Sequence, residues 1–246
     1  SRTKNHWPME GDVERLEAQL QSLKRRGANV LVLTDPSETS VCTQLLGSES
    51  IVRRRLLVRT HGTEQVASDL DPARFGLVEV PGTMTRTTLT EPSDSTSLPS
   101  GSRPVEPRTP HRTASTSTAD SPGWFSRTEP ETSLSTLARH IHDHLTRFEA
   151  EDPTPGEIRV CFDSLDTLVD DVAYPQLHRF LHVVTTRVRA ARGIGHYHLS
   201  TSDSQKVGDD FERLFDATVE TRPTADGTQQ RWTLHEAEIQ TDWLSL

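Results

Sequence analysis

Cysteine, lysine and long apolar runs are all scarce in this chain of 246 residues. Cys42 and Cys161 are the only cysteines, which excludes a disulfide framework and an all-cysteine zinc site. No apolar run approaches the roughly 18 residues that a membrane span requires, and no charged-then-apolar leader opens the chain. We therefore expect a cytoplasmic protein that neither enters a membrane nor is secreted, and a reducing compartment fits so few cysteines.

The chain also lacks an excess of basic residues. Acidic residues outnumber basic ones by 36 to 27, so the formal net charge is −9, and only Lys4, Lys24 and Lys206 are lysines. This acidic, lysine-poor and threonine-rich composition resembles that of proteins from haloarchaea that accumulate salt, where long-range attraction between charges is screened. The same acidity argues against a nucleic-acid partner, because a protein that binds nucleic acid normally carries a basic face.

Apolar residues are concentrated in short segments that alternate between strand and helix patterns. Strands are predicted at 29–33, 54–59, 75–80, 158–162, 196–199, 217–220 and 231–235. Helices are predicted at 13–26, 41–46, 133–150, 174–192 and 205–215. Strands that alternate with helices form βαβ units, so we expect an α/β fold with a mostly parallel central sheet flanked by helices.

The composition changes abruptly at residues 83–131. These 49 residues include 11 Thr, 9 Ser and 7 Pro, and they can bury too little apolar surface to offset their ordering entropy. We predict a long disordered insertion here, between the first half of a domain (13–82) and its second half (132–246), with a flexible N-terminus at 1–12. Trp124 and Phe125 are interpreted as an edge that rejoins the core, with a short docking motif as the alternative.

A family resemblance rests on the segment 159–200. It begins RVCFDSLD, an apolar strand that ends in Asp-Ser-Leu, and continues through a helix to a second strand. This layout resembles the KaiC-like branch of the RecA-superfamily ATPases, in which the second nucleotide motif ends in Asp-Ser and the next strand runs through the sheet centre. The resemblance covers 28–79 and 133–235 and implies a RecA-like three-layer sandwich. The stretches 179–182 and 195–199 also resemble an uncharacterised haloarchaeal family of KaiC-like proteins.

The turn at 34–40 (TDPSETS) departs from that family. A phosphate loop needs glycines, whose backbone N–H groups cradle phosphates, and a lysine that reaches the β and γ oxygens. This turn has neither, and Asp35 and Glu38 place negative charge where a triphosphate would lie. Pro36 removes one N–H donor, while Thr39 and Ser40 keep hydroxyls that also serve as ordinary helix caps. We interpret the loop as degenerate.

Asp163 follows the apolar strand at 158–162. The resemblance implies a water-mediated contact between Asp163 and Mg²⁺. The ordinary alternative is a strand-end carboxylate that caps a turn with Ser164, and the missing lysine favours this alternative. The carboxylates that come next, Asp166, Asp170 and Asp171, are expected to form a solvated acidic face.

Thr39, Ser40 and Asp163 are therefore the candidate nucleotide-site positions. No catalytic residue or metal ligand is proposed, and no cofactor is expected, with ATP and Mg²⁺ as the alternative. Histidine pairs with zinc-compatible spacing occur at His140/His144, His178/His182 and His196/His198, but ordinary hydrogen-bonded histidines are favoured over ligands. Cys161, in the middle of a strand, is expected to be a small buried hydrophobe.

Three functions follow from these observations. The favoured one is a non-catalytic RecA- or KaiC-like domain that acts as a signalling or regulatory module through a protein partner or a second copy of itself. The alternative is an ATPase or ATP sensor with an unconventional phosphate loop. A second alternative is a DNA-associated regulator. The basic residues that could contact DNA are Arg53–Arg55, Arg187, Arg189 and Arg192, although ion pairs between these arginines and carboxylates are the favoured interpretation.

Overall fold

A computed structural model describes residues 10–34, 51–60, 71–80, 123–127, 133–225 and 227–245, and the structural statements below concern these residues. The predicted helix at 41–46 and the positions Thr39 and Ser40 lie outside them. So do most of the predicted N-terminal tail and all of the predicted insertion except 123–127.

The described chain alternates strands with helices. The strands are β1 (Ala28–Thr34), β2 (Arg54–Arg59), β3 (Phe75–Glu79), β4 (Phe125–Arg127), β5 (Ile158–Phe162), β6 (Ile194–Ser200), β7 (Ala217–Thr224), β8 (Gly227–Leu234), β9 (Ile239–Gln240) and β10 (Leu244–Ser245). The helices are α1 (Glu10–Arg26), α3 (Leu134–Glu149), α4 (Asp166–Asp171), α5 (Tyr174–Ala190) and α6 (Asp209–Glu212), with a 3₁₀ turn, η1, at Asp203–Lys206.

All described strands belong to one mixed sheet. Its order is β10-β8-β7-β1-β6-β5-β2-β3-β4, and β9 pairs with β8. The pairings from β7 to β4 are parallel, whereas β8 pairs antiparallel with β7, β9 and β10. The predicted α/β fold with a mostly parallel sheet is therefore confirmed, and β6 lies near its centre, between β1 and β5.

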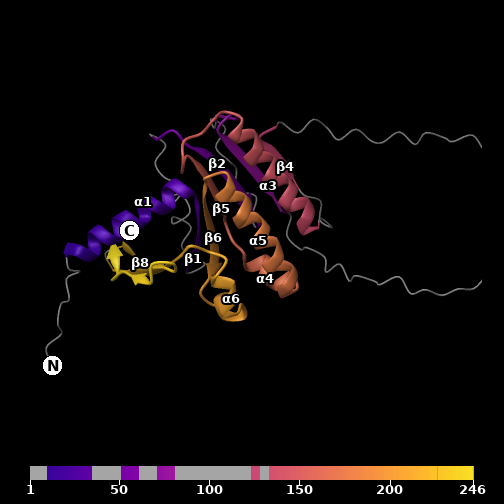
Figure 1. Cartoon of the computed structure of the whole chain (residues 1–246). Coiled ribbons are helices and arrows are strands. Elements are labelled where there is room, and N and C mark those ends of the chain that lie inside the picture. Colours follow the sequence, from indigo (N-terminus) through magenta and orange to yellow (C-terminus); the bar gives the residue numbers. More distant parts are fainter. Residues whose placement is uncertain are drawn as a thin grey trace, which may run out of the picture.

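Alternate residues of the parallel strands face opposite sides of the sheet, and each side has its own apolar cluster. The larger cluster unites residues of the central strands, among them Leu56, Val160, Phe162, Tyr197 and Leu199, with the buried faces of α3 and α5. The smaller cluster joins Val30, Val32, Ala217 and Val219 with Leu23 of α1. Helices therefore flank the sheet, with α3 and α5 on one side and α1 on the other (Figure 1).

Gly27 ends helix α1, as the sequence predicts. Its φ of +83° lies in the left-handed region that favours glycine. A Cβ at this position would lie 2.9 Å from the carbonyl oxygen of Arg189 and 3.0 Å from the Cα of Arg192. Glycine therefore lets the chain turn from α1 into β1 directly against the end of α5.

The structure differs from the prediction in two elements. The predicted helix at 205–215 is wrong: the segment forms the short turn η1 and the short helix α6. Gly208 separates them with an extended backbone, at φ −81° and ψ 169°, which interrupts a continuous helix. Helix α4 was not predicted, because its six residues are too short for a periodic apolar pattern. The predicted edge at Trp124 and Phe125 is confirmed, since β4 pairs with β3 at the end of the sheet.

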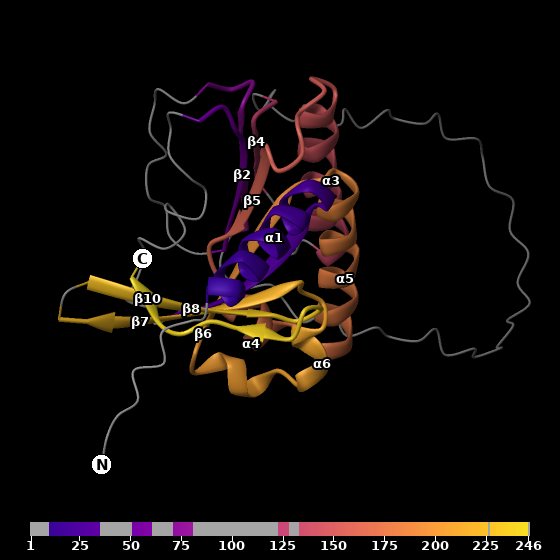
Figure 2. The ribbon, with the colours of Figure 1, turned by 60° about the vertical axis from the view of Figure 1, so that its left-hand side comes forward.

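The hairpin of β7 and β8 is longer than predicted and projects from the body of the protein (Figure 2). Strand β1 pairs with β7 only as far as Glu220, so the outer part of β7 is held by β8. The guanidinium carbons of Arg222 and Arg231 lie 4.0 and 4.8 Å from the ring centroid of Trp243. These two cation–π contacts attach the C-terminal segment to the hairpin.

Candidate functional site at the carboxyl ends of the parallel strands

The carboxyl ends of β1, β6, β5 and β2 lie side by side at one edge of the sheet. In open α/β sheets this edge is where ligands bind. The strand ends carry polar residues: Thr34 on β1, Ser200 on β6, Asp163 after β5 and Thr60 after β2. Asp163, the described member of the predicted nucleotide positions, thus lies at the edge that the resemblance requires.

The carboxylate of Asp163 is engaged within the protein. Its Oδ1 accepts hydrogen bonds from the backbone N–H of Thr60 at 2.8 Å and from the Thr60 hydroxyl at 2.9 Å. The same oxygen accepts the backbone N–H of Ser164 at 2.7 Å. The Thr60 hydroxyl also lies 2.7 Å from the carbonyl oxygen of Ser164. Asp163 therefore joins the end of β2 to the end of β5 and caps the turn with Ser164. Turn capping is the ordinary alternative that the sequence offered to a contact with Mg²⁺.

Asp166, the first residue of α4, makes a second connection at this edge. Its Oδ1 accepts the backbone N–H of Ser200 at 2.9 Å, and its Oδ2 accepts the hydroxyl of Ser164 at 2.8 Å. The Ser164 oxygen in turn accepts the backbone N–H of Asp166 at 2.9 Å. Asp166 thus ties α4 to β6, so the expectation that it belongs to a solvated acidic face is wrong. Asp170, by contrast, is exposed.

Lys206 in η1 is the described lysine nearest this edge. Its Nζ lies 2.6 Å from Oδ1 of Asp170 and 2.9 Å from Oδ1 of Asp203. Hydrogen bonds to these two carboxylates raise the pKa of Lys206. The ammonium group of Lys206 is therefore neutralised by Asp170 and Asp203. It does not replace the lysine that a phosphate loop would supply.

The candidate histidines do not assemble into a metal centre within the described ranges, which contain no group of three or more metal-binding side chains. His144 is buried, and its Nε2 lies 3.2 Å from the hydroxyl of Ser126 on β4. Nη2 of Arg147 lies 3.4 Å from its Nδ1, so Nδ1 is the acceptor and Nε2 carries the proton. Burial, together with the charge of Arg147, lowers the pKa of His144 to about 4.

His196 and His198 are buried on β6, on the side of the sheet that carries α1. Burial lowers the pKa of His198 to about 4 and that of His196 well below its usual value. Both imidazoles are therefore neutral near pH 7. Neither Nδ1 of His196 nor Nε2 of His198 has a hydrogen-bond partner among the described residues.

Cys161 is fully buried in β5, as a mid-strand position predicts, but it is disulfide-bonded and not a free thiol. The expectation of a simple buried hydrophobe is therefore wrong in this respect. Cys42 is the only other cysteine of the chain and lies outside the described residues.

Several arginines that were candidates for a DNA contact are paired with carboxylates. Arg54 Nε lies 3.4 Å from Glu157, and Arg189 Nη2 lies 3.0 Å from Asp216. Arg187 binds Glu149 on α3 and also donates to Nδ1 of His142 at 3.0 Å. These pairs hold neighbouring elements together. Pairing with carboxylates is the structural role that the sequence analysis favoured over a contact with DNA.

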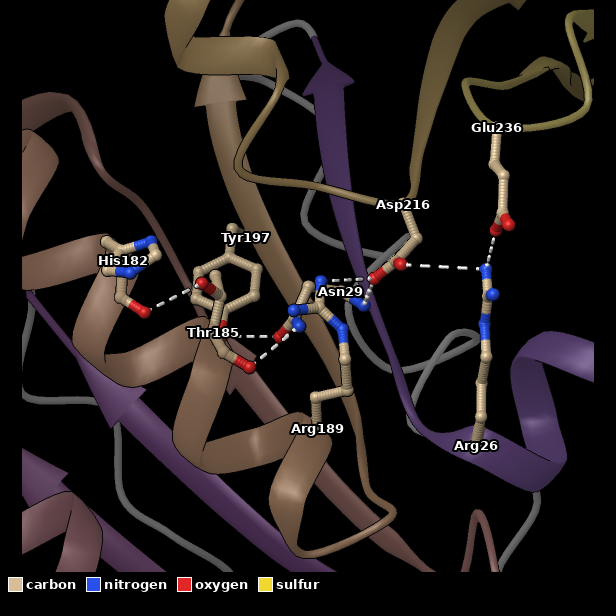
Figure 3. Close-up of polar contacts among 8 residues, drawn as sticks. All are labelled: Arg26, Asn29, His182, Thr185, Arg189, Tyr197, Asp216 and Glu236. Atoms are coloured by element: carbon tan, nitrogen blue, oxygen red, sulfur yellow. Dashed lines mark hydrogen bonds and ion pairs between the residues drawn. The ribbon is translucent and has the colours of Figure 1, made fainter.

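A buried polar network, missed by the sequence analysis, joins the amino end of β1 to its surroundings (Figure 3). Asn29 accepts a hydrogen bond from the Tyr197 hydroxyl at 2.9 Å and donates one to the carbonyl oxygen of Thr185 at 3.0 Å. Its backbone N–H donates to Oδ2 of Asp216 at 2.8 Å, and the same carboxylate binds Arg189. The sign of this network in the sequence is Asn29, a polar residue at the start of the otherwise apolar run NVLVL.

The described helices include none that is long and apolar enough to cross a membrane. The sheet and the polar edge define an α/β protein whose mostly parallel sheet is flanked by helices and whose strand ends are joined by hydrogen-bonded carboxylates. Residues 27–221, most of the chain, match a family of unknown function, DUF7504, and the chain belongs to that family. A comparison with curated proteins gives no match.

Proposed function

We propose that this protein is a non-catalytic RecA- or KaiC-like domain that works as a signalling or regulatory module, through a protein partner or a second copy of itself. Two features of the sheet support the relationship. Asp163 and Ser164 directly follow the strand IRVCF, at the edge where the resemblance requires the second nucleotide motif. The following strand, β6, runs through the sheet centre, as in the KaiC-like branch.

The hydrogen bonds of Asp163 are the main support for a non-catalytic role. One carboxylate oxygen already accepts three hydrogen bonds from Thr60 and Ser164, so it serves as a structural link between two strands. Lys206 in η1 is paired with two carboxylates. The segment 34–40 supplies neither glycine nor lysine. These residues do not fit the binding of Mg-ATP in the usual manner, so we assign them no step of phosphoryl transfer.

An ATPase or ATP sensor remains the alternative, because Asp163 keeps the position that the family uses. Calorimetric titration of Mg-ATP in molar KCl distinguishes the two functions. The matched variants are Asp163→Asn, which keeps an acceptor oxygen but removes the charge, and Asp170→Asn, which removes an exposed carboxylate on α4. We expect no binding heat for any of the three proteins. A dissociation constant below about 100 μM that is lost only in Asp163→Asn would establish the alternative instead.

A second measurement tests the interaction itself. Light scattering coupled to size exclusion, in molar KCl and over a wide range of protein concentrations, reports whether the chain associates with itself. Concentration-dependent growth in mass supports a second copy as the partner. A strictly monomeric protein that also binds no nucleotide assigns the interaction to a different protein.

A further inference from the structure

The disulfide-bonded Cys161 lies in β5, between β6 and β2, and no part of it is exposed. Its neighbours along the strand, Val160 and Phe162, belong to the larger apolar cluster on the side of α3 and α5. Because successive side chains of a strand alternate, the sulfur of Cys161 lies on the other side of the sheet. On that side the three strands carry mostly polar and charged residues next to it.

Arg159 is the charged residue on β5 that shares this side. It precedes Cys161 by two residues, so their Cα atoms lie about 6.6 Å apart, a distance that an arginine side chain spans. Only 8% of Arg159 is exposed, its Nε has no hydrogen-bond partner, and no described carboxylate pairs with it. Burial, followed by the charges of Arg53 and Arg55, lowers the pKa of Arg159 to about 10. The described residues therefore supply no anion to this buried cation.

His196 approaches Cys161 from β6. The two residues are register partners, so their side chains lie side by side on one side of the sheet. The imidazole is buried and neutral near pH 7, and its Nδ1 has no hydrogen-bond partner among the described residues. The charge of Arg159 acts on the same imidazole, which places the three groups in one neighbourhood. In the tautomer that is protonated at Nδ1, His196 can donate a hydrogen bond to an anion.

Strand β2 completes the surroundings with residues that have partners of their own. Leu57 is the register partner of Cys161, and Arg55 and Arg59 lie two residues to either side of it. Arg59 pairs with Glu79, and both arginines make further interactions. Arg159 is therefore the cation on which the argument rests.

Two more titratable groups lie near Cys161 along β5 and β6. Asp163 follows β5 at about 13 Å from Arg159 in extended chain, too far to act as its counter-ion. Its Oδ1 already accepts three hydrogen bonds, which hold the carboxylate at the strand end. His198 is neutral near pH 7, because burial lowers its pKa to about 4. Neither group balances the charge of Arg159.

Reduction of the disulfide changes this charge balance. A disulfide is uncharged, whereas a reduced cysteine can ionise to a thiolate. Burial alone disfavours the thiolate, but a neighbouring cation stabilises it. Arg159 lacks an anion while the disulfide is intact and gains one when Cys161 becomes a thiolate. Groups that stabilise the reduced form make a disulfide easier to reduce.

We propose that the disulfide of Cys161 is a redox-active site that dithiols reduce, and that Arg159 and His196 stabilise the Cys161 thiolate. A thiolate of the dithiol attacks the partner sulfur, forms a mixed disulfide with it and expels the Cys161 sulfur with the bonding electron pair. The second sulfur of the dithiol then closes its own disulfide and releases the partner sulfur, which takes up one proton. The other proton of the dithiol passes to solvent. The dithiol is thus oxidised by two electrons, and the inference does not depend on the function proposed above.

The test is a redox equilibrium of the folded protein in mixtures of reduced and oxidised dithiothreitol, quenched by alkylation and read by mass spectrometry. The variant is Arg159→Met, which keeps the length of the side chain and removes the charge. Its matched control is Arg179→Met, which removes the same charge from an exposed position on α5. We expect the equilibrium constant for reduction to fall at least about tenfold in Arg159→Met, which corresponds to a potential about 30 mV lower. Arg179→Met should match the wild type.

Three results would overturn the proposal. The first is an Arg159→Met equilibrium equal to that of the wild type. The second is an equal shift in Arg179→Met, which would show that the effect belongs to the net charge and not to the place of Arg159. The third is a wild type that keeps free thiols in oxidised dithiothreitol, because such a protein holds no disulfide to reduce.

A second variant decides the matter if Arg159→Met does not fold. Cys42→Ser leaves Cys161 as the only thiol of the chain. Ultraviolet absorbance of the thiolate, followed against pH, gives the pKa of this thiol in the folded protein. We expect a value below the usual value of about 8.5, to which the thiol should return when urea unfolds the variant. A folded Cys161 that titrates at or above the unfolded value would refute thiolate stabilisation by Arg159 and His196.

Discussion

The hydroxyl of Tyr197 donates a hydrogen bond of 2.9 Å to Oδ1 of Asn29, and both residues are completely buried. The bond joins β6 to β1, and the Asn29 amide continues it to the carbonyl oxygen of Thr185 on α5. Strand β1 therefore meets the sequence-distant pair of α5 and β6 through one asparagine side chain. A polar group this deeply buried is tolerated because its partners replace water.

Removing the Tyr197 hydroxyl should destabilise the protein. In Tyr197→Phe, Oδ1 of Asn29 stays buried without its donor, and we expect the free energy of unfolding to fall by about 1–3 kcal/mol. Urea denaturation at fixed salt measures the change. The control is Tyr174→Phe, which removes an exposed hydroxyl that donates to Asp210 and should cost less than about 0.5 kcal/mol. Equal losses in the two variants would contradict the importance of the buried network.

Truncating the larger apolar cluster should cost more. Phe162 stacks on Tyr197 with ring centroids 5.0 Å apart, and Leu181 packs on the same side of the sheet from α5. Phe162→Ala is expected to lower the free energy of unfolding by about 3–5 kcal/mol and Leu181→Ala by about 2–5 kcal/mol. Val183→Ala, at an exposed position of α5, is the control and should have little effect. A loss in Val183→Ala as large as that in Leu181→Ala would show that the cluster is misassigned.

Acidification should destabilise the protein between about pH 6.5 and 4. In the folded state the pKa of both His144 and His198 is lowered to about 4, whereas an unfolded histidine has a pKa of about 6.5. The unfolded chain therefore binds more protons in this window, so the stability that these histidines contribute is complete above it and is lost as the pH falls. Each contributes up to about 3 kcal/mol.

Denaturation at a series of pH values measures this slope. His144→Gln, which keeps a polar group beside Ser126, should make the slope shallower. A His144→Gln variant with the wild-type slope would show that His144 does not resist protonation in the folded protein.

The last residues of the predicted insertion are structural, and replacement variants should show it. Strand β4 pairs with β3, and Trp124 lies against Phe75 with ring centroids 6.3 Å apart. Replacing 83–122 by a Gly-Ser linker of about twelve residues, long enough for a parallel crossover, should cost little. Replacing 83–131 in the same way should cost about 1–3 kcal/mol more, because β4 and its aromatic contacts are removed. Differential scanning calorimetry compares the two, and equal stabilities would exclude a structural role for β4.

The sequence predicted most strands of the parallel sheet, because buried strands are typically apolar runs such as VLVL in β1. It also placed Asp163 at a strand end. It did not reveal the partners of that carboxylate, since Thr60 is distant in the chain and becomes its neighbour only when β2 pairs with β5. The same reason hid the bond between Asn29 and Tyr197. Nor did the sequence show that Arg159 lies beside Arg55, because this neighbourhood follows only from the sheet register.

The position of β1 has a consequence for how the chain folds during its synthesis. Strand β1 is made early, but its neighbours β6 and β7 begin at Ile194 and Ala217. At 5–20 residues per second, a ribosome needs on the order of 10–30 s to supply them. Throughout that interval a strongly apolar strand has both edges exposed, and its closure depends on contacts of long sequence separation, which form slowly. The nascent protein is therefore most vulnerable to aggregation before β6 and β7 have left the ribosome.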